Sequence, residues 1–387
     1  MSASRRRVLT GGAGAALTGA VAACGSDNGR GGASGGSGRP ALRQWYHQHG
    51  EAGTEQAVRR RAAAFAGADV NIQWRPGNYD EQTAAALLSG DGPDVFEGGP
   101  ALDQILGGQV AGLTDLVKDV REVFHRAAPT LKTHRGRIYG IPQVIDTQLL
   151  YHRKSRPAKA GVRPPQTVNQ LLDAARALAT RDVKGLLLGN DGGAGVPGGT
   201  PLYAAGLSLV TDHGDVGFDD PQAARPLGRI HDLYAGKALL LGAPSDWSDP
   251  AALIQGLTAL QRSGLRALPQ VEQALGDDFG VLPFPSDGPH GSPCVPVGGY
   301  GSAVNALGIH TELSRKFVKW LWVDRTDDQV GFALSYGFHI PAGLPLARRA
   351  DRLKKGAADG ARPGPQTFRH ITFPQLRAMS AAPCCRW

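Results

Sequence analysis

The sequence predicts an α/β fold in which strands of a mostly parallel sheet alternate with flanking helices. Three observations favour this class. Apolar, strand-like stretches alternate with amphipathic, helix-like stretches over residues 41–97, and a second such unit begins near residue 149. No repeat of 20–50 residues indicates a solenoid or a propeller. The 54 glycines and 27 prolines among 387 residues supply frequent turns between the elements.

The first unit predicts the order strand, helix, strand, helix, strand. We expect Ala84, Leu87 and Leu88 on the inward face of its second helix, which ends at a Gly-Asp-Gly-Pro turn. Ligands of such sheets lie beyond the carboxyl ends of the strands, which here carry His47-Gln48-His49 and Glu97-Gly98-Gly99. The predicted strands are 41–47, 69–75 and 94–96, and the predicted helices are 54–65 and 79–89.

The second unit predicts a helix opened by a capping box of Thr167 and Gln170, followed by a buried strand over 185–190. Asp249 then caps a predicted helix over 250–263, which a glycine at 264 ends. Its core face would carry Leu253, Ile254, Leu257 and Leu260. A last amphipathic helix is predicted over 312–323.

Composition excludes several classes of protein. An apolar fraction of 41% is too high for a disordered chain and too low for a protein with many membrane spans. The formal charge is +8, and it falls to +5 without the three arginines of residues 1–23. These charges are scattered and have no interleaved aromatic patch, so the sequence predicts no nucleic-acid partner.

The amino terminus is typical of an export signal. Three arginines at 5–7 precede a mild apolar run of thirteen residues, which is too short to cross a bilayer. Arg5-Arg6 is similar to a twin-arginine signal, although Val8 departs from that motif, so Tat and Sec export both remain open. Val21-Ala22-Ala23-Cys24 is similar to a lipobox, so 1–23 is the predicted signal and Cys24 the predicted lipidation site. Residues 24–40 form a predicted Gly-rich tether.

Seven fragments, in order along the mature chain, resemble the extracellular solute-binding proteins of ABC importers, in particular sugar-binding lipoproteins. The resemblance extends from about residue 41 to residue 342. Relatives often carry Trp near 265, where this chain has Leu265, and the resemblance ends beyond about Asp359. The fragments are Tyr79 to Phe96, Gly140 to Pro142, Leu150 to Lys154, Pro165 to Ala175, Gly298 to Tyr300, Phe317 to Leu321 and Gly337 to Pro341.

The resemblance implies a two-lobe, periplasmic-binding-protein-like fold, with each lobe a mostly parallel sheet flanked by helices and hinge strands joining the two. Lobe 1 would hold 41–143 plus 285–332, and lobe 2 would hold 144–284 plus 333–387. The implied function is capture of a sugar or oligosaccharide in the interlobe cleft and its delivery to ABC permease subunits. Such a protein is not an enzyme, needs no cofactor and is anchored outside the cell membrane.

Recognition of a sugar needs aromatic rings for its C–H faces and planar polar groups for its hydroxyls. Residues of these types follow the predicted strands or lie in Gly-rich segments, and we expect the ligand to contact them. The candidates are His47, His49, Glu51, Glu97, Asp146, Asn190, Asp191, Trp247, Gly299, Tyr300 and His339. Trp45 and Trp74 are expected in the core.

Two alternative functions use some of the same residues. Glu97 and Asp146 would be the carboxylate pair of a secreted glycoside hydrolase. His47 and His49, with Glu97 or Asp146, would hold Zn²⁺ in a metal-binding lipoprotein. No distinctive catalytic or metal motif supports either alternative. Cys294 could pair with Cys384 or Cys385, and the sequence does not decide between them.

Overall fold

The structure is a computed structural model that describes residues 38–49, 51–118, 133–189, 200–207, 216–243, 248–336, 338–343 and 345–346. The strands are β1 Ala41–His47, β2 Asp69–Arg75, β3 Val95–Glu97, β4 Thr133–His134, β5 Arg137–Ile138, β6 Ile141–His152, β7 Lys184–Leu187, β8 Thr258–Gly264, β9 Gly280–Leu282, β10 Val297–Val304 and β11 Ile340–Pro341. The helices are α1 Thr54–Ala63, α2 Tyr79–Ser89, α3 Leu102–Leu106, α4 Ser155–Lys159, α5 Val168–Leu178, α6 Thr200–Ala204, α7 Ala224–Ala235, α8 Ala251–Ile254, α9 Leu268–Leu275, α10 Thr311–Lys319 and α11 Thr326–Ser335. A π-helix over Trp320–Asp324 follows α10.

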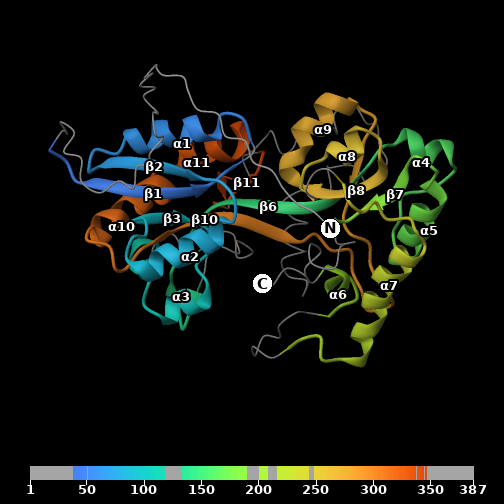
Figure 1. Cartoon of the computed structure of the whole chain (residues 1–387), viewed down its shortest axis with the longest axis horizontal. Helices are drawn as coiled ribbons and strands as arrows, with labels where there is room; N and C mark the ends of the chain where they lie inside the picture. The colour runs from blue at the N-terminus through green and yellow to red at the C-terminus, as the bar shows by residue number, and fades with distance from the viewer. Residues whose placement is uncertain are drawn as a thin grey trace, which may run out of the picture. The chain divides into compact units, whose positions relative to one another are not determined.

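The strands form a hydrogen-bonded path in the order β2-β1-β3-β10-β6-β8-β7, and β9 and β11 pair with β6 beside it. Pairing is parallel where β1 meets β2 and β3, and where β7 meets β8. The pairs that involve β6 or β10 are antiparallel. The α/β fold is thus confirmed, with two parallel regions joined by two long antiparallel strands (Figure 1).

The twelve-residue strand β6 changes partners along its length. Its first part, Ile141–Thr147, pairs with β10. Its last part, Gln148–His152, pairs with β8, and β9 pairs with Leu150–His152. One continuous strand therefore belongs to both regions of the sheet (Figure 1).

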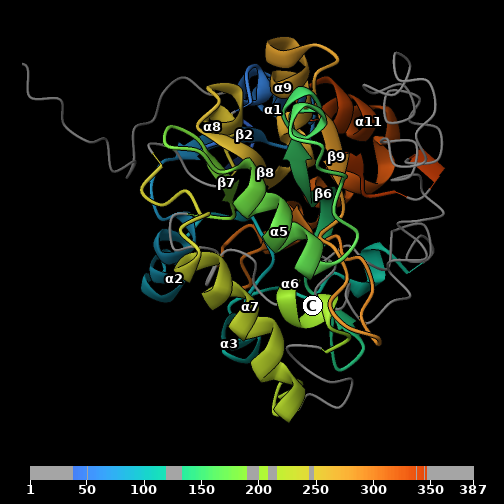
Figure 2. The same cartoon turned by 90° about the vertical axis from the view of Figure 1, so that its right-hand side faces the viewer.

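Two large apolar cores divide along the same strand. Ile141 and Val144 of β6 pack in one core with residues of β1, α1, α10 and α11. Ile145 and Leu149–Tyr151 pack in the other core with residues of α5, α7, β8 and α9. Figure 1 shows α1 and α11 on the side of the first region opposite α2, and Figure 2 is viewed from the side of α5 and α7.

Most predicted elements are confirmed. β1, β2 and α2 have the predicted bounds, and Thr167 Oγ1 accepts a hydrogen bond from the Gln170 amide at 3.3 Å at the start of α5. Trp45 is buried in the core, as predicted. The prediction of the inward face of α2 is partly wrong. Leu87 is buried as predicted, but Leu88 is 74% exposed, and Thr83 is buried as well.

The helix predicted over 250–263 is wrong. The cap itself forms, because Asp249 accepts a hydrogen bond from the Ala251 amide at 2.8 Å, but α8 ends at Ile254. Gly256 then adopts a positive φ of 79°, which ends the helix. The chain continues as β8, a seven-residue strand that is buried throughout because it pairs on both sides, with β6 and with β7.

Within the described residues, no helix is long and apolar enough to cross a membrane.

Candidate functional site

The site begins where the parallel strands β1 and β3 end side by side. The Tyr79 hydroxyl accepts a hydrogen bond from the Glu97 amide at 3.0 Å and lies 3.1 Å from the Trp45 carbonyl oxygen, so it ties the two strand ends together. The Glu97 side chain, at the end of β3, is only 1% exposed. His47, the last residue of β1, places Nδ1 2.5 Å from Glu97 Oε2. Parallel pairing therefore brings the two predicted strand ends into contact, as expected.

His49 shares the same carboxylate. Its Nε2 lies 3.0 Å from Glu97 Oε1 and 3.1 Å from Oε2, and its side chain is 2% exposed. Burial alone would raise the pKa of Glu97, but the charges of His49 and His47 and their hydrogen bonds lower it to about 2. Burial alone would lower the pKa of His49, but Glu97 and Glu51 raise it to about 9. This end of the sheet therefore holds a buried, mutually compensated group of charges.

Glu51 extends this group. Its carboxylate oxygens lie 3.7 Å from His49 Nδ1, 3.6 Å from His339 Nε2 and 3.8 Å from an Arg266 nitrogen. Burial would raise the pKa of Glu51, but the two histidines hold it well below its usual range. Both oxygens are inaccessible and accept no hydrogen bond from a described residue. Glu51 is thus a caged carboxylate with lone pairs available to a donor.

Asp146 forms the far side of the group, from the middle of β6. Its Oδ1 accepts hydrogen bonds from the Thr147 amide at 2.9 Å and the Leu265 amide at 3.0 Å, and lies 3.9 Å from His339 Nδ1. A Cβ on Gly264 would come within 2.7 Å of Asp146 Oδ2, so glycine makes room for this carboxylate. Burial would lower the pKa of His339, but Asp146 and Glu51 raise it.

Tyr300 of β10 supplies an aromatic ring beside these charges. Its ring centroid lies 4.6 Å from that of His47, and an Arg266 nitrogen donates a hydrogen bond to its hydroxyl at 3.3 Å. Gly299 lies within the strand β10, where a Cβ would come within 2.4 Å of the Val144 carbonyl oxygen. Its lack of a side chain therefore serves the close pairing of β10 with β6.

Seven of the sequence-predicted residues thus form one contiguous group, which we call the polar network together with Arg266. These seven are His47, His49, Glu51, Glu97, Asp146, Tyr300 and His339. The candidates Asn190, Asp191 and Trp247, and the lipidation site Cys24, lie outside the described residues, as do Cys384 and Cys385.

Sequence reasoning missed Arg266. Gly264 was correctly predicted to end the preceding element, but that element was predicted as a helix over 250–263 instead of the strand β8, which placed the following residues on a different path. In the structure Gly264 ends β8 and starts a 3-10 turn over Leu265–Ala267, which directs Arg266 into the polar network while Leu265 is buried.

The network has an accessible layer and a buried layer. The side chains of His47, Arg266, Asp146 and Glu51 are 23%, 21%, 15% and 12% exposed. Glu97, His49 and His339 lie behind them at 1–3% exposure. In this structure His47, Arg266 and Asp146 can contact a solute, whereas the two Glu51 oxygens are closed to it. The second layer supports the first.

Glu97 does not suit the role of general acid in a glycoside hydrolase. A general acid needs a carboxyl group whose pKa is raised toward neutrality, whereas the two histidines lower the pKa of Glu97 to about 2. The arrangement is suited to binding polar groups rather than to delivering a proton from this carboxyl.

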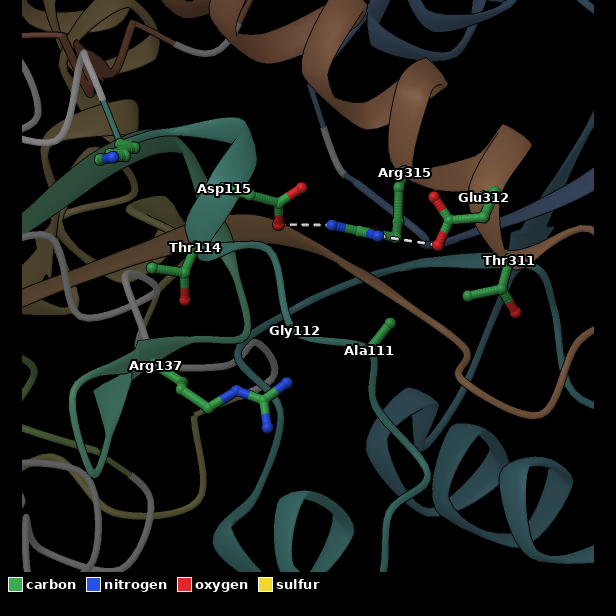
Figure 3. Close-up of a pocket in the computed structure, with 9 residues that line it drawn as sticks. Ala111, Gly112, Thr114, Asp115, Arg137, Thr311, Glu312 and Arg315 are labelled. Atoms are coloured by element: carbon green, nitrogen blue, oxygen red, sulfur yellow. Dashed lines mark hydrogen bonds and ion pairs between the residues drawn. The ribbon is translucent and has the colours of Figure 1, made fainter.

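A separate pocket of about 510 Å³ contains none of the predicted residues (Figure 3). Within it Arg315 forms ion pairs with Asp115 and, at 2.7 Å, with Glu312 (Figure 3). The pair with Asp115 links α10 to the 3-10 turn over Thr114–Leu116, and the pair with Glu312 lies within α10. The pocket is lined by Ala111, Gly112, Thr114, Asp115, Lys118, Arg137, Thr311, Glu312 and Arg315.

The chain has the two-lobe fold of ABC transporter solute-binding proteins. One similar structure is the GacH receptor of Streptomyces glaucescens, solved unliganded and with acarbose, with a TM-score of 0.68, 24% identity and coverage of 89% of this chain and 95% of that one. Another is a solute-binding protein from Thermotoga lettingae bound with α-D-tagatose, with a TM-score of 0.67, 20% identity and coverage of 80% and 83%.

A third similar structure is maltose-bound MalE3 of T. maritima, with a TM-score of 0.67, 19% identity and coverage of 88% of this chain and 94% of that one. No protein-family model matches the chain, and a sequence comparison with curated proteins gives no match.

Proposed function

We propose that this protein is an extracytoplasmic binding protein that captures a carbohydrate at the polar network and delivers it to an ABC permease. The observation that carries the proposal is the convergence of seven polar and aromatic side chains from distant parts of the chain on one network, in the fold shared by sugar-bound structures. These groups accept and donate hydrogen bonds beside one aromatic ring, which is what a hydroxylated ring compound requires.

The accessible layer would make the contacts. The second oxygen of Asp146 would accept hydrogen bonds from sugar hydroxyls, and Arg266 would donate to ring or hydroxyl oxygens. The carboxylate oxygens of Glu51 are buried in this structure, so opening of the hinge would have to expose them before they accept a sugar hydroxyl. Tyr300 packs against a C–H face of the sugar. Because the acids and bases of the network neutralise each other, the site favours a neutral ligand over an ionic one.

The lobes would meet at this network. The division expected from the sequence puts residues 41–143 plus 285–332 in lobe 1 and 144–284 plus 333–387 in lobe 2. The change of partners along β6 and the two separate cores support two such lobes but favour shifted boundaries. Val144, Ala333 and Leu334 pack in the first core, so we place the boundary on β6 near residue 147 and the last boundary after α11. Arg266 of lobe 2 then contacts Glu51 of lobe 1, and hinge closure would bring these two side chains onto the sugar.

The amino-terminal signals complete the proposal. Export through residues 1–23, lipidation of Cys24 and a tether over 24–40 would hold the protein at the outer face of the cell membrane, next to the permease. The protein would hand over its ligand chemically unchanged and would not act as an enzyme.

A calorimetric and thermal-shift screen of the purified protein against a panel of mono- and oligosaccharides, in the presence of a chelator, tests the proposal. A cognate sugar at 100 times its Kd should stabilise the protein by about 2.7 kcal/mol. Glu51→Gln and Asp146→Asn should each weaken binding about tenfold or more, because each removes charge-assisted hydrogen bonds. Chromatography of the incubated sugar should show no product.

The matched control is Arg137→Ala in the separate pocket, which should leave sugar affinity unchanged. If no sugar is retained, or if the Glu51 and Asp146 variants bind as tightly as the Arg137 variant, the assignment of the polar network is wrong.

A further inference from the structure

We infer that His47, His49 and Glu97 form a binding site for one divalent transition-metal ion of the zinc class, in addition to the proposed capture of a carbohydrate. The three side chains offer His47 Nδ1, His49 Nε2 and a Glu97 oxygen, and these donor atoms all lie within 4.8 Å of one another. The inference rests on this geometry and does not depend on the proposed function.

The spacing of the donor atoms fits a single ion. In a tetrahedral zinc site with bonds of about 2.0–2.1 Å, neighbouring ligand atoms lie about 3.3 Å apart. Here the nitrogen–oxygen distances are 2.5 Å for His47 and 3.0 Å for His49. The nitrogen–oxygen separation would have to widen by about 0.8 Å at His47 and about 0.3 Å at His49 to admit an ion that takes the place of the shared protons.

The backbone and the surrounding residues hold these ligands in place. His47 and Glu97 are the last residues of the paired strands β1 and β3, and Tyr79 ties those strand ends together. The second nitrogen of His49, Nδ1, faces Glu51 Oε2 at 3.7 Å. A carboxylate behind the far nitrogen of a histidine is the usual way in which proteins orient a metal-binding imidazole.

The ligand set and its exposure indicate the kind of ion. Two imidazoles and one carboxylate favour zinc-class ions over Mg²⁺ and Ca²⁺, which prefer oxygen ligands. His47 is 23% exposed, whereas His49 and Glu97 are almost fully buried. An ion would therefore enter beside His47, and its fourth position would face that open side.

Calorimetric titration of chelator-treated, untagged protein with ZnCl₂ and with MgCl₂, without sugar, tests this site. We expect one Zn²⁺ per chain and no binding of Mg²⁺. His47→Gln should weaken Zn²⁺ binding by more than about tenfold, and Glu51→Gln, which retains all three donor atoms, by a smaller factor. Co²⁺ should give the visible absorption of a four-coordinate ion, and His47→Gln should abolish it.

The matched control is His231→Gln, which removes an exposed histidine from α7 and should leave Zn²⁺ affinity unchanged. Absence of Zn²⁺ binding, or an equal Kd in the His47 and His231 variants, overturns the metal site. If circular dichroism shows that His47→Gln is unfolded, the Glu51 variant decides in its place: an unchanged Zn²⁺ affinity overturns the site.

The two proposals fail separately. Retention of a sugar by protein that binds no Zn²⁺ would overturn the metal site alone. Site-specific Zn²⁺ binding by protein that retains no sugar would overturn the proposed capture of a carbohydrate alone.

Discussion

His49 and His152 are both buried, but they lie in regions of the protein with opposite electrostatics. His49 belongs to the polar network, where Glu97 and Glu51 outweigh the effect of burial and raise its pKa to about 9. His152 is the last residue of β6. There burial, together with the charge of Lys154, lowers its pKa to about 4, and Asp278 opposes this only weakly. One region stabilises buried charge, and the other excludes it.

The difference teaches where this fold places binding chemistry. Burying a charge is costly unless an opposite charge or a hydrogen bond compensates it. Beside His49 the chain supplies two acidic side chains, from the end of β3 and from the segment after β1, and beside the neighbouring His339 a third from the middle of β6. Near His152 the packing is close, because a Cβ on Gly280 would come within 2.4 Å of the imidazole ring, and the buried Nδ1 has no hydrogen-bond partner among the described residues. Only the first region is built to bind polar groups.

The largest expected effect comes from removing the carboxylate that two histidines share. Glu97→Gln should lower the free energy of unfolding by about 3–5 kcal/mol, because it leaves buried basic groups without their partner. Urea denaturation of the two proteins measures this difference.

The control removes an ion pair at the surface of the protein. Asp115→Asn breaks the pair with Arg315, but Asp115 is 68% exposed, so the expected cost is below about 1 kcal/mol. Equal losses in the Glu97 and Asp115 variants would show that burial does not distinguish the two regions.

Acid should destabilise the second region through His152. In the unfolded chain this histidine takes up a proton below its ordinary pKa of 6.5, but in the folded protein only below about 4. Its contribution is therefore fully present above pH 6.5 and is lost as the pH falls from 6.5 to 4, to a total of about 3 kcal/mol. Unfolding free energies measured across this range should fall more steeply for the wild type than for His152→Gln. Parallel pH profiles would contradict the buried, neutral state of His152.

Much of this contrast was present in the sequence. Period-two and period-3.6 patterns predicted β1, α1, β2, α2 and β3, and the rule for the carboxyl ends of parallel strands then predicted that His47, His49 and Glu97 would lie close together. These predictions succeeded because local periodicity and sheet topology act over short stretches of chain.

Other parts depend on contacts between distant segments. Glu51 and His339 meet only because β11 pairs with β6 and the chain after α11 turns back toward it. Thr258–Gly264 carries no alternating pattern and includes buried Gln261 and Arg262, so its strand state comes from its partners β6 and β7. A genuine helix cap at Asp249 therefore predicted too long a helix.

Two glycines extend the comparison from charges to packing. Gly280→Ala would place a Cβ 2.4 Å from Cε1 of the buried His152 ring. His152 is buried at 8% exposure, so the ring and its neighbours must shift to make room, and we expect a loss of about 1–3 kcal/mol in stability. Calorimetric titration should show unchanged affinity for any sugar that the protein binds. A loss of sugar affinity without a loss of stability would mean that this region also belongs to the binding site.

Gly264→Ala should have a small effect on stability and a larger effect on binding. Its Cβ would come within 2.7 Å of Asp146 Oδ2, the mobile end of an acidic side chain, so the carboxylate can rotate away at a cost of about 1 kcal/mol. That rotation moves an acceptor of the polar network, and sugar affinity should fall about tenfold. Gly228→Ala is the control, because a Cβ there meets no atom within 4 Å and alanine favours the helix α7. If Gly264→Ala binds sugar as tightly as Gly228→Ala, Asp146 does not contact the ligand.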